Sequence, residues 1–488
     1  MAAPREIELK LELDPLRAAG ARRQIRRLPD LRAEGETRRL VSAIFDSGDH
    51  ALRRGGLVLR IRRDGESRIQ TLKAAGAGML IERSEWESEV GRDEPDPALI
   101  PDPALRARVE AAGSLAPVLE TDFERTLWHV RRQGSDVEVA LDLGRIRAGG
   151  REVPIGEIEL ELKSGSAAVL FALGREIVSA VPARLGLQSK SERGYALLDA
   201  AQPAKAEPFL VGRKMRAGAA FQAIVRTCLR HYCLNEPGIL ARQVEPLHKA
   251  RVAIRRLRSC WKLHKALLAD AEAARLGREL RALSRSLGTA RNLDVHLERI
   301  AAEGAPDELR AAIAADRERA YDRLARQLRS KRNRLLLLDV MAYAETGAWL
   351  RDPARRRARE RKVSSFATKI LRRHWKKLRK AGRDLAGQTP QARHRVRIDG
   401  KVLRYAAEFF AGAFAGRKAD GRRRKMLEAL AEMQTHLGDL NDIETAAAYE
   451  AAFRRSGDMP GQDARKAALL ASAQAAHDRI ARGEPFWR

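Results

Sequence analysis

Cysteine is scarce in this chain of 488 residues, which holds only Cys228, Cys233 and Cys260. The three cysteines form no C-x-x-C pair and no Cys/His set with the spacing of zinc ligands. The sequence therefore gives no indication of a zinc site, and a sparse, odd number of cysteines favours a reducing compartment.

Long apolar runs are also missing. The longest candidate, "LLLLDVMAYA" at 335–344, is interrupted by Asp339 and is far shorter than a membrane-spanning helix. The N-terminus "MAAPREIELK" lacks the apolar core of a signal peptide. We therefore predict a soluble protein of the cytoplasm that makes no membrane contact.

Acidic residues are too few to balance the basic ones, but only in the second part of the chain. Residues 1–200 hold 32 Lys and Arg against 33 Asp and Glu, whereas residues 201–488 hold 62 against 32. A strongly basic region attracts polyanions such as polyphosphate, nucleic acid or an anionic surface. Aromatic residues make up only 5% of the chain, and no nucleic-acid-binding motif is apparent, so we disfavour nucleic acid as the partner.

The hydrophobic pattern divides the chain into two predicted domains. Residues 1–200 consist mainly of short alternating segments separated by Gly-, Asp- or Pro-containing turns, as in an antiparallel β domain. The expected strands are 6–13, 39–46, 56–63, 67–74, 82–90, 125–132, 136–144 and 156–164, and the expected helices are 15–28 and 167–181. Residues 201–208 form an Ala/Pro-rich linker. From residue 209 to 488 the period changes to 3.6, which predicts an all-α bundle.

The first predicted strand carries an unusual density of charge. In "EIELKLEL" (6–13), Glu6, Glu8, Lys10 and Glu12 share one face and four aliphatic residues share the other. For a single strand, the simplest interpretation is a charged side that faces water. Other strands, however, repeat the arrangement at Arg60 with Arg62, Thr71 with Lys73, Arg83 with Glu85, Glu138 with Asp142, and Glu157 with Glu159.

If this sheet closes into a barrel, one of its faces becomes the interior. Acids and bases buried there without water or a ligand would be strongly destabilising. Carboxylates, however, bind Mg²⁺ or Mn²⁺, and Lys and Arg bind phosphoryl oxygens. The alternation therefore predicts an antiparallel β-barrel whose interior holds a divalent cation and a phosphate chain.

The helical part contains an internal repeat. "HKARVAIRRLRSCWKL" (248–263) aligns with "HRVRIDGKVLRYAAEF" (394–409), and each is followed by a related stretch, "LGTARNLDV" (287–295) and "LGDLNDIET" (437–445). The repeats are expected at about 215–345 and 360–485. Each repeat places four basic residues on one helix face, namely His248, Arg251, Arg255 and Arg258, and His394, Arg397, Lys401 and Arg404. One such face is usually just solvated, but its recurrence favours a polyphosphate-binding surface.

The N-terminal part resembles the CYTH, or triphosphate tunnel metalloenzyme, superfamily. "EIELK" (6–10) is similar to its ExExK signature, and further similar motifs follow in order through "LQSKSERGY" (187–195). Where the family often has an aromatic-Asp-Thr-Pro turn, this chain has "FDSGD" (45–49). The helical part resembles the CHAD domain, and this domain order resembles bacterial inorganic triphosphatases. The fold implied is an eight-stranded antiparallel tunnel followed by a duplicated helical bundle.

The resemblance also implies roles for individual residues. Glu6, Glu8 and Lys10 would be catalytic, and the metal would be bound by Glu6, Glu8, Asp142, Glu157 and Glu159. The substrate phosphates would be bound by Arg60, Arg62, Lys73, Arg83, Glu85, Arg125, Lys190 and Arg193. The implied cofactor is Mg²⁺ or Mn²⁺.

The function implied is metal-dependent hydrolysis of inorganic triphosphate to diphosphate and phosphate, with long-chain polyphosphate as the partner of the helical domain. This partner makes polyphosphate granules a candidate location within the cytoplasm. Two alternatives are a polyphosphate-docking protein without catalysis and a triphosphatase that acts on thiamine triphosphate or nucleotides. The sequence does not distinguish among these substrates, and it gives neither the metal preference nor the oligomeric state.

Overall fold

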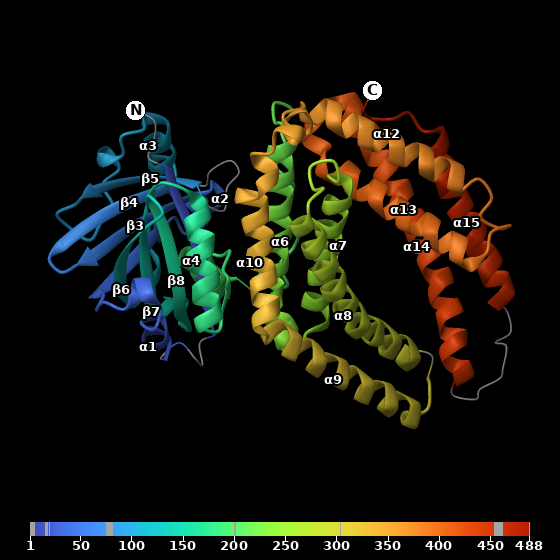
Figure 1. Cartoon of the computed structure of the whole chain (residues 1–488), viewed down its shortest axis with the longest axis horizontal. Coiled ribbons are helices and arrows are strands. Elements are labelled where there is room, and N and C mark those ends of the chain that lie inside the picture. Colours follow the sequence, from blue (N-terminus) through green and yellow to red (C-terminus); the bar gives the residue numbers. More distant parts are fainter. Residues whose placement is uncertain are drawn as a thin grey trace. The chain divides into compact units, whose positions relative to one another are not determined.

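The computed structural model describes residues 5–14, 18, 20–74, 82–199, 202–302, 304–452 and 462–487, without the side chains of residues 5, 6, 82–84, 442, 444–452 and 462. The chain divides into two compact units, each made of three separate segments. Figure 1 colours the chain by position in the sequence. Unit 1 comprises residues 1–207, 226–255 and 271–348, and unit 2 comprises 208–225, 256–270 and 349–488. The sheet and most of the first helical repeat thus share one unit. The domain boundaries expected at residues 200 and 209 group the chain differently and stay predictions.

Within the described residues, nine antiparallel strands form one sheet in unit 1: the eight that the alternating pattern predicts and a ninth, of three residues, that it does not. The strands are β1 (Arg5–Leu13), β2 (Glu36–Asp46), β3 (Leu57–Asp64), β4 (Ser67–Ala74), β5 (Glu82–Glu89), β6 (Ala116–Arg132), β7 (Ser135–Ala148), β8 (Arg151–Ser164) and β9 (Ala183–Leu185). Their order is β5-β4-β3-β2-β6-β7-β8-β1-β9, and β5 also pairs with β1, with Glu6 opposite Arg83. Strand β5, the first in this order, therefore also pairs with β1, which lies near the other end of the order.

Strands β6, β7 and β8 are longer than the sequence pattern predicts. Strands β7 and β8 run to either side of Gly149 and Gly150, whose φ angles are 54° and 72°. Positive φ at both central residues is typical of a two-residue hairpin turn, which glycine adopts at no steric cost. Because the turn is this tight, pairing continues to its edge, from Ala148 opposite Arg151 onward.

The helices follow the predicted change of period. The shorter ones that accompany the sheet are α1 (Ala21–Ile25), α2 (Ala51–Arg54), α3 (Pro103–Glu110), α4 (Ala167–Ala180) and α5 (Lys190–Leu198). Those that follow are α6 (Ala217–Leu240), α7 (Val244–Leu263), α8 (Ala271–Ala302), α9 (Asp307–Arg329), α10 (Lys331–Thr346), α11 (Arg356–Arg359), α12 (Val363–Ala381), α13 (Pro390–Phe409), α14 (Arg417–Ala452) and α15 (Gln462–Arg482). Of the predicted helix 15–28, the structure describes residues 18 and 20–28, and only Ala21–Ile25 are α-helical, so the prediction is wrong at 26–28, where the chain turns. No helix among the described residues combines the length and apolar character that a membrane crossing requires.

Helix α4 covers the apolar face of the sheet and also contacts the helical part of unit 1 (Figure 1). Its Gly174 allows close packing, because a Cβ there would lie 2.8 Å from Cδ2 of Leu9 on β1. The same Cβ would lie 3.6 Å from Cδ2 of Leu338 on α10. All three residues are buried. The absence of a side chain at Gly174 therefore lets α4 pack closely against both β1 and α10.

The duplicated motifs of the helical part form equivalent contacts, each within its own unit. Arg251 on α7 lies beside Gly288 on α8, where an added Cβ would be 3.7 Å from its Nε. Arg397 on α13 lies beside Gly438 on α14, where an added Cβ would be 2.7 Å from its Nη2. In both cases the glycine leaves room for an arginine of the predicted basic face.

Candidate functional site

The register of the sheet brings charged residues from distant parts of the sequence onto one face. Lys10 on β1 lies opposite Glu159 on β8, Glu12 lies opposite Glu157, and Asp142 on β7 lies opposite Arg125 on β6. Side chains of a strand alternate between the two faces, so Leu9 and Leu11 point to the buried apolar side instead. We call the side that carries Lys10, Asp142 and Glu159 the charged face.

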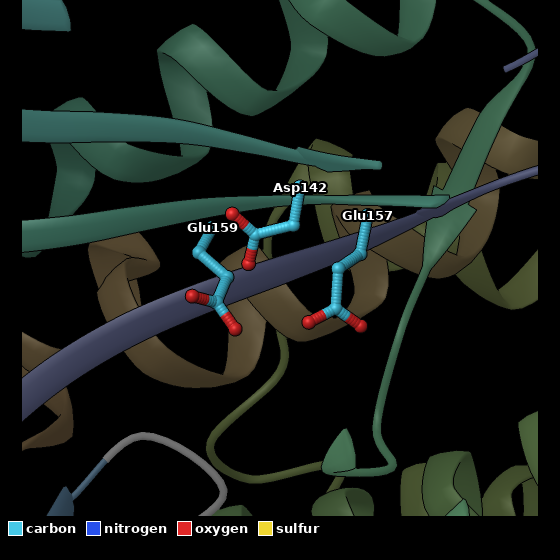
Figure 2. A group of neighbouring side chains, drawn as sticks. All are labelled: Asp142, Glu157 and Glu159. Atoms are coloured by element: carbon cyan, nitrogen blue, oxygen red, sulfur yellow. The ribbon is translucent and has the colours of Figure 1, made fainter. Parts of the chain in front are cut away.

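Three carboxylates gather at the centre of the charged face, as Figure 2 shows. Asp142, Glu157 and Glu159 each offer one oxygen that lies within 4.8 Å of the others. The side chains of Asp142 and Glu157 have no exposed surface, and that of Glu159 is 16% exposed. Burial raises the pKa of Glu157 despite the neighbouring lysines. This acidic cluster is consistent with a cation site made of hard oxygen donors.

Two lysines reach the acidic cluster from different elements. Lys10 Nζ lies 2.7 Å from Glu159 Oε1 and 3.3 Å from Glu157 Oε1. Lys190, the first residue of α5, has its Nζ 2.6 Å from Asp142 Oδ2 and 3.0 Å from Glu159 Oε1. Burial opposes the charge on both lysines, but the carboxylates raise the pKa of each. Both groups are therefore held as cations.

Arg125 completes this side of the site. Its Nε and Nη2 donate to the two oxygens of Asp142 at 2.7 Å each, and Nη2 also donates to Glu159. Burial alone would raise the pKa of Glu159, but the three neighbouring cations lower it well below its usual range. The ring of Phe123 lies beneath two of these cations, 5.7 Å from Arg125 Cζ and 4.9 Å from Lys190 Nζ.

A second charged group lies on β3, β4 and β5. Arg60 Nη2 donates to Thr71 Oγ1 at 3.0 Å and lies 3.7 Å from Glu85 Oε1, while Lys73 Nζ donates to Glu85 Oε2 at 2.8 Å. Burial, with repulsion from Arg62 and Arg125, lowers the pKa of Arg60 to about 10.

The donor set suits a divalent cation. Glu8 Oε1 and Glu157 Oε2 are buried, and neither accepts a hydrogen bond from the residues that the structure describes. Their cationic neighbours are more distant, since Lys10 Nζ is 3.7 Å from the former oxygen and Arg193 Nη1 is 3.6 Å from the latter. Buried carboxylate oxygens without a close donor are destabilising unless a cation compensates them.

The structure brings together most of the residues predicted from sequence. Ten of the side chains expected in the N-terminal site lie on this face or on α5, namely Glu8, Lys10, Arg60, Lys73, Glu85, Arg125, Asp142, Glu157, Glu159 and Lys190. Arg62 shares strand and parity with Arg60, and Arg193 lies one turn after Lys190. Glu6 and Arg83 pair on neighbouring strands, but their side chains lie outside the described residues.

Sequence reasoning missed two charged residues that adjoin the site. Glu12 continues the parity of Lys10 and accepts from Arg184 Nη2 at 3.0 Å. The alternation of "EIELKLEL" placed Glu12 on the same face as the predicted residues, but no role was predicted for it. Arg184 has no such signal, since it belongs to the three-residue strand β9.

The predicted basic faces of the helical part lie on α7 and α13. On α7 all four basic residues are partly buried, and burial together with Arg291 lowers the pKa of His248. On α13 the leading His394 is exposed, with Nδ1 3.3 Å from Asn441 Oδ1, and Arg404 pairs with Glu408 at 3.1 Å. The basic face of α7 therefore lies beside α8, which carries the related stretch 287–295. The basic face of α13 lies beside α14, which carries the related stretch 437–445.

Comparison with known proteins gives two family matches. Residues 4–195 match the CYTH domain, and residues 223–449 match the CHAD domain. An inorganic triphosphatase of Haemophilus influenzae is 34% identical over 199 residues, which are 39% of this chain and 54% of that protein. The matched region thus spans about half of that relative's length.

Solved structures resemble each part separately. The CHAD domain from the plant Ricinus communis is 28% identical, with a TM-score of 0.47 over 57% of this chain and 97% of that one. A putative adenylyl cyclase from Hippeastrum, described as having a dominant triphosphatase activity, is 16% identical, with a TM-score of 0.29 over 39% of this chain and 95% of that one.

Proposed function

Since this chain joins a CYTH domain at residues 4–195 to a CHAD domain at residues 223–449, we propose that it is a metal-dependent inorganic triphosphatase whose helical part binds polyphosphate. The reaction is hydrolysis of inorganic triphosphate to diphosphate and phosphate. The name of the Haemophilus relative supports this substrate. The proposed location is the cytoplasm.

One observation carries the proposal: three carboxylates and three cations converge on the charged face. Asp142, Glu157 and Glu159 supply the acids, and Lys10, Arg125 and Lys190 supply the bases. A site of acids alone would favour a cation, and a site of bases alone would favour an anion. The mixture suits an anionic phosphate chain that carries its own divalent cation.

The acidic residues are the proposed cation ligands. Glu8, Asp142, Glu157 and Glu159, with Glu6, would bind Mg²⁺ or Mn²⁺ through their carboxylate oxygens. When bound, such a cation neutralises charge on the phosphoryl oxygens and polarises the terminal phosphorus.

The basic residues are the proposed phosphate ligands. Lys10, Arg125 and Lys190 contact the acidic cluster, and Arg60 and Lys73 belong to the second charged group. Arg62, Arg83 and Arg193 are proposed as further phosphate ligands, together with Glu85, which accepts from Lys73. Held as cations by the neighbouring acids, the lysines are already charged when the substrate arrives. Their fixed positions orient the chain of phosphates, and this preorganisation stabilises charge that develops in the transition state.

The proposed chemical step is an in-line displacement. The oxygen of a water molecule forms a bond to the terminal phosphorus while the bridging P–O bond breaks, and diphosphate leaves with the bonding electron pair. Glu8 carries a buried carboxylate oxygen without a hydrogen-bond donor, which supports it as the group that orients this water and accepts its proton.

The two basic faces of the helical part are the proposed polyphosphate surface. Their eight residues repeat at the same spacing on α7 and α13, and like charges at that spacing repel one another. A polyanion bound along each face relieves this repulsion. The net excess of 30 positive charges in residues 201–488 supports a polyanionic partner.

Phosphate release from inorganic tripolyphosphate tests the proposal. Purified protein is assayed with Mg²⁺, with Mn²⁺ and with excess EDTA, beside thiamine triphosphate and ATP as alternative substrates. We expect release that requires metal and is fastest with tripolyphosphate. If tripolyphosphate binds but no phosphate is released with either metal, the protein is a docking protein and not an enzyme. Faster phosphate release from thiamine triphosphate or ATP would overturn the substrate assignment.

A further inference from the structure

The segment from Arg184 to Glu192 leads from β9 into α5, and its first residues run antiparallel beside β1. Leu185 of β9 is opposite Leu11 of β1, and the backbone N–H of Gly186 donates to the carbonyl of Lys10 at 2.9 Å. A Cβ on Gly186 would lie 2.8 Å from Glu12 Cγ and 3.1 Å from Lys10 Cγ. The path of this segment therefore constrains two charged side chains of β1.

The same segment delivers Lys190 to the acidic cluster. Ser189 caps α5 because its N–H donates to Glu192 Oε2 at 2.7 Å and its hydroxyl accepts from the N–H of Glu192 at 3.2 Å. This capping box fixes where α5 begins, and Lys190 is its first residue. The position of the Lys190 ammonium thus depends on how residues 187–192 are held.

Helix α6 of the helical part holds this segment at its first end. Glu236 is 5% exposed, and its Oε2 accepts from Arg184 Nη1 at 3.3 Å. Arg184 also donates to Glu12 Oε2 at 3.0 Å, so it joins α6 to the charged face of β1. Tyr232, one turn earlier on α6, donates its hydroxyl to Glu236 Oε1 at 3.2 Å. All of these residues belong to unit 1.

Helix α6 also holds the segment at its second end. Arg230 donates to the carbonyl of Leu187 and to the carboxylate of Glu192, the partner of Ser189 in the capping box, and its Nε donates to Glu207 Oε1 at 2.8 Å. Its side chain is only 16% exposed, which strengthens these charge-assisted hydrogen bonds. One arginine of the helical part therefore contacts both the loop before α5 and Glu192 in the first turn of α5.

These contacts assign a function to helix α6 that lies outside polyphosphate binding. We propose that Arg230 and Glu236 are positioning residues of the triphosphate site, which fix the segment 184–192 and through it Lys190 and Lys10. This inference rests on the proposed function, because Lys190 is taken as a phosphate ligand. It makes the helical part a structural component of the phosphate-hydrolysing site.

A double-mutant cycle in the full chain tests whether Arg230 acts through Lys190. Arg230→Gln, Lys190→Ala and the double variant are compared with the unaltered protein for kcat and KM with tripolyphosphate. In parallel, the Kd of tripolyphosphate is measured calorimetrically in EDTA. We expect Arg230→Gln to raise KM and Kd about tenfold in the unaltered background and less than about twofold once Lys190 is absent. A merely structural role would give equal effects in both backgrounds.

Arg317→Gln is the matched control. Arg317 on α9 is also 16% exposed and also pairs with a carboxylate, since its Nε donates to Asp294 Oδ1 at 2.7 Å. We expect its small effect on KM and Kd to be the same in both Lys190 backgrounds. Glu236→Gln, which preserves shape but removes the charge opposite Arg184, provides a second variant should Arg230→Gln lower the thermal midpoint.

The outcomes separate the inference from the proposed function. If the unaltered protein binds tripolyphosphate without hydrolysing it, the triphosphatase assignment fails, while the binding cycle still decides the role of Arg230. Equal effects of Arg230→Gln and Glu236→Gln with and without Lys190, or no effect of either, would overturn the inference even in a fully active enzyme.

Discussion

Lys10 and Glu159 are 149 positions apart in sequence, yet Lys10 Nζ donates to Glu159 Oε1 at 2.7 Å. The contact exists because β1 and β8 pair in a register that places these residues directly opposite one another. A shift by one residue would turn every charged side chain of β1 to the apolar side. Register therefore determines whether the acids and bases of this site meet.

Glu8 is the first residue to test by substitution. Glu8→Gln keeps the volume of the side chain but removes the negative charge that would bind the cation and accept a proton from water. We expect kcat for tripolyphosphate to fall at least about 100-fold, with an unchanged thermal midpoint. Phosphate release and a thermal unfolding curve are the two measurements, and unchanged turnover would refute the assignment of this face as the site.

Removal of Arg125 should destabilise the fold as well as the site. Arg125→Gln leaves Asp142, whose side chain has no exposed surface, without its bidentate partner, which should cost about 3 kcal/mol of unfolding free energy. Arg39→Gln is the control, because Arg39 makes a similar bidentate contact to Asp122 at 2.9 Å but is 72% exposed. This exposed pair should cost less than about 1 kcal/mol. Urea unfolding compares them, and equal losses would contradict the role of burial.

The glycines beside the basic faces give a pair of matched variants. Gly438→Ala places a Cβ 2.7 Å from Arg397 Nη2, so the guanidinium must move, whereas Gly288→Ala makes an ordinary contact of 3.7 Å with Arg251 Nε. Both should gain stability, by up to about 1 kcal/mol, because alanine favours a helix over glycine. Only Gly438→Ala should weaken polyphosphate binding, about threefold. Calorimetric titration with long-chain polyphosphate measures this affinity. If the two variants bind polyphosphate equally well, the result would count against the predicted surface.

Charge on the basic faces should appear in the salt dependence of polyphosphate binding. Arg255→Gln and Lys401→Gln each remove one cation that would bind a phosphate, so the slope of log Kd against log salt should be smaller by about one unit in each variant. Arg319→Gln on α9, which removes a charge that is 61% exposed and lies outside both faces, should leave the slope unchanged. Competition with duplex DNA at the same salt measures selectivity, and stronger retention of DNA would contradict a polyphosphate surface.

Stability should fall in mild acid because of a buried histidine in unit 2. Burial lowers the pKa of His264 to about 4, and its ring stacks on Phe366 with centroids 5.0 Å apart. Since an unfolded histidine titrates near 6.5, the unfolded chain binds one more proton between these two pH values. The contribution of His264 to the unfolding free energy is therefore greatest above pH 6.5 and should decrease by about 1.4 kcal/mol per pH unit between 6.5 and 4.

His264→Gln removes this titration. Its unfolding free energy, followed by urea titration between pH 7 and pH 4.5, should change less steeply than that of the unaltered chain by the contribution of one proton. Identical slopes would show that His264 is not held neutral in the folded protein.

The sequence predicted the faces of the strands better than their ends. Alternation in "EIELKLEL" identified the charged face, because period two is set by backbone geometry alone. It did not predict that β7 and β8 extend to Gly149 and Gly150, since the turn is defined by backbone conformation rather than by a change of hydrophobic pattern. The basic helices were predicted equally well, because their spacing follows the 3.6-residue period.

Contacts between elements could not be predicted in the same way. A pattern shows that α4 has an apolar side, but not that Gly174 lies between Leu9 and Leu338. Arg184 and Arg230 likewise stand among many basic residues, and only the fold selects Glu12 and Glu192 as their partners. The residues that sequence reasoning missed are therefore those whose role depends on tertiary packing.

The contact of Gly174 with both Leu9 and Leu338 has a consequence for how such proteins recombine. A chimaera that exchanges the helical half of this chain at the Ala/Pro-rich linker would retain the covalent connection but lose the complementary surface of α10. Donor halves would have to carry a compatible side chain at the position of Leu338 to be accepted. Close packing of α4 against α10 therefore restricts which helical halves the sheet can be joined to.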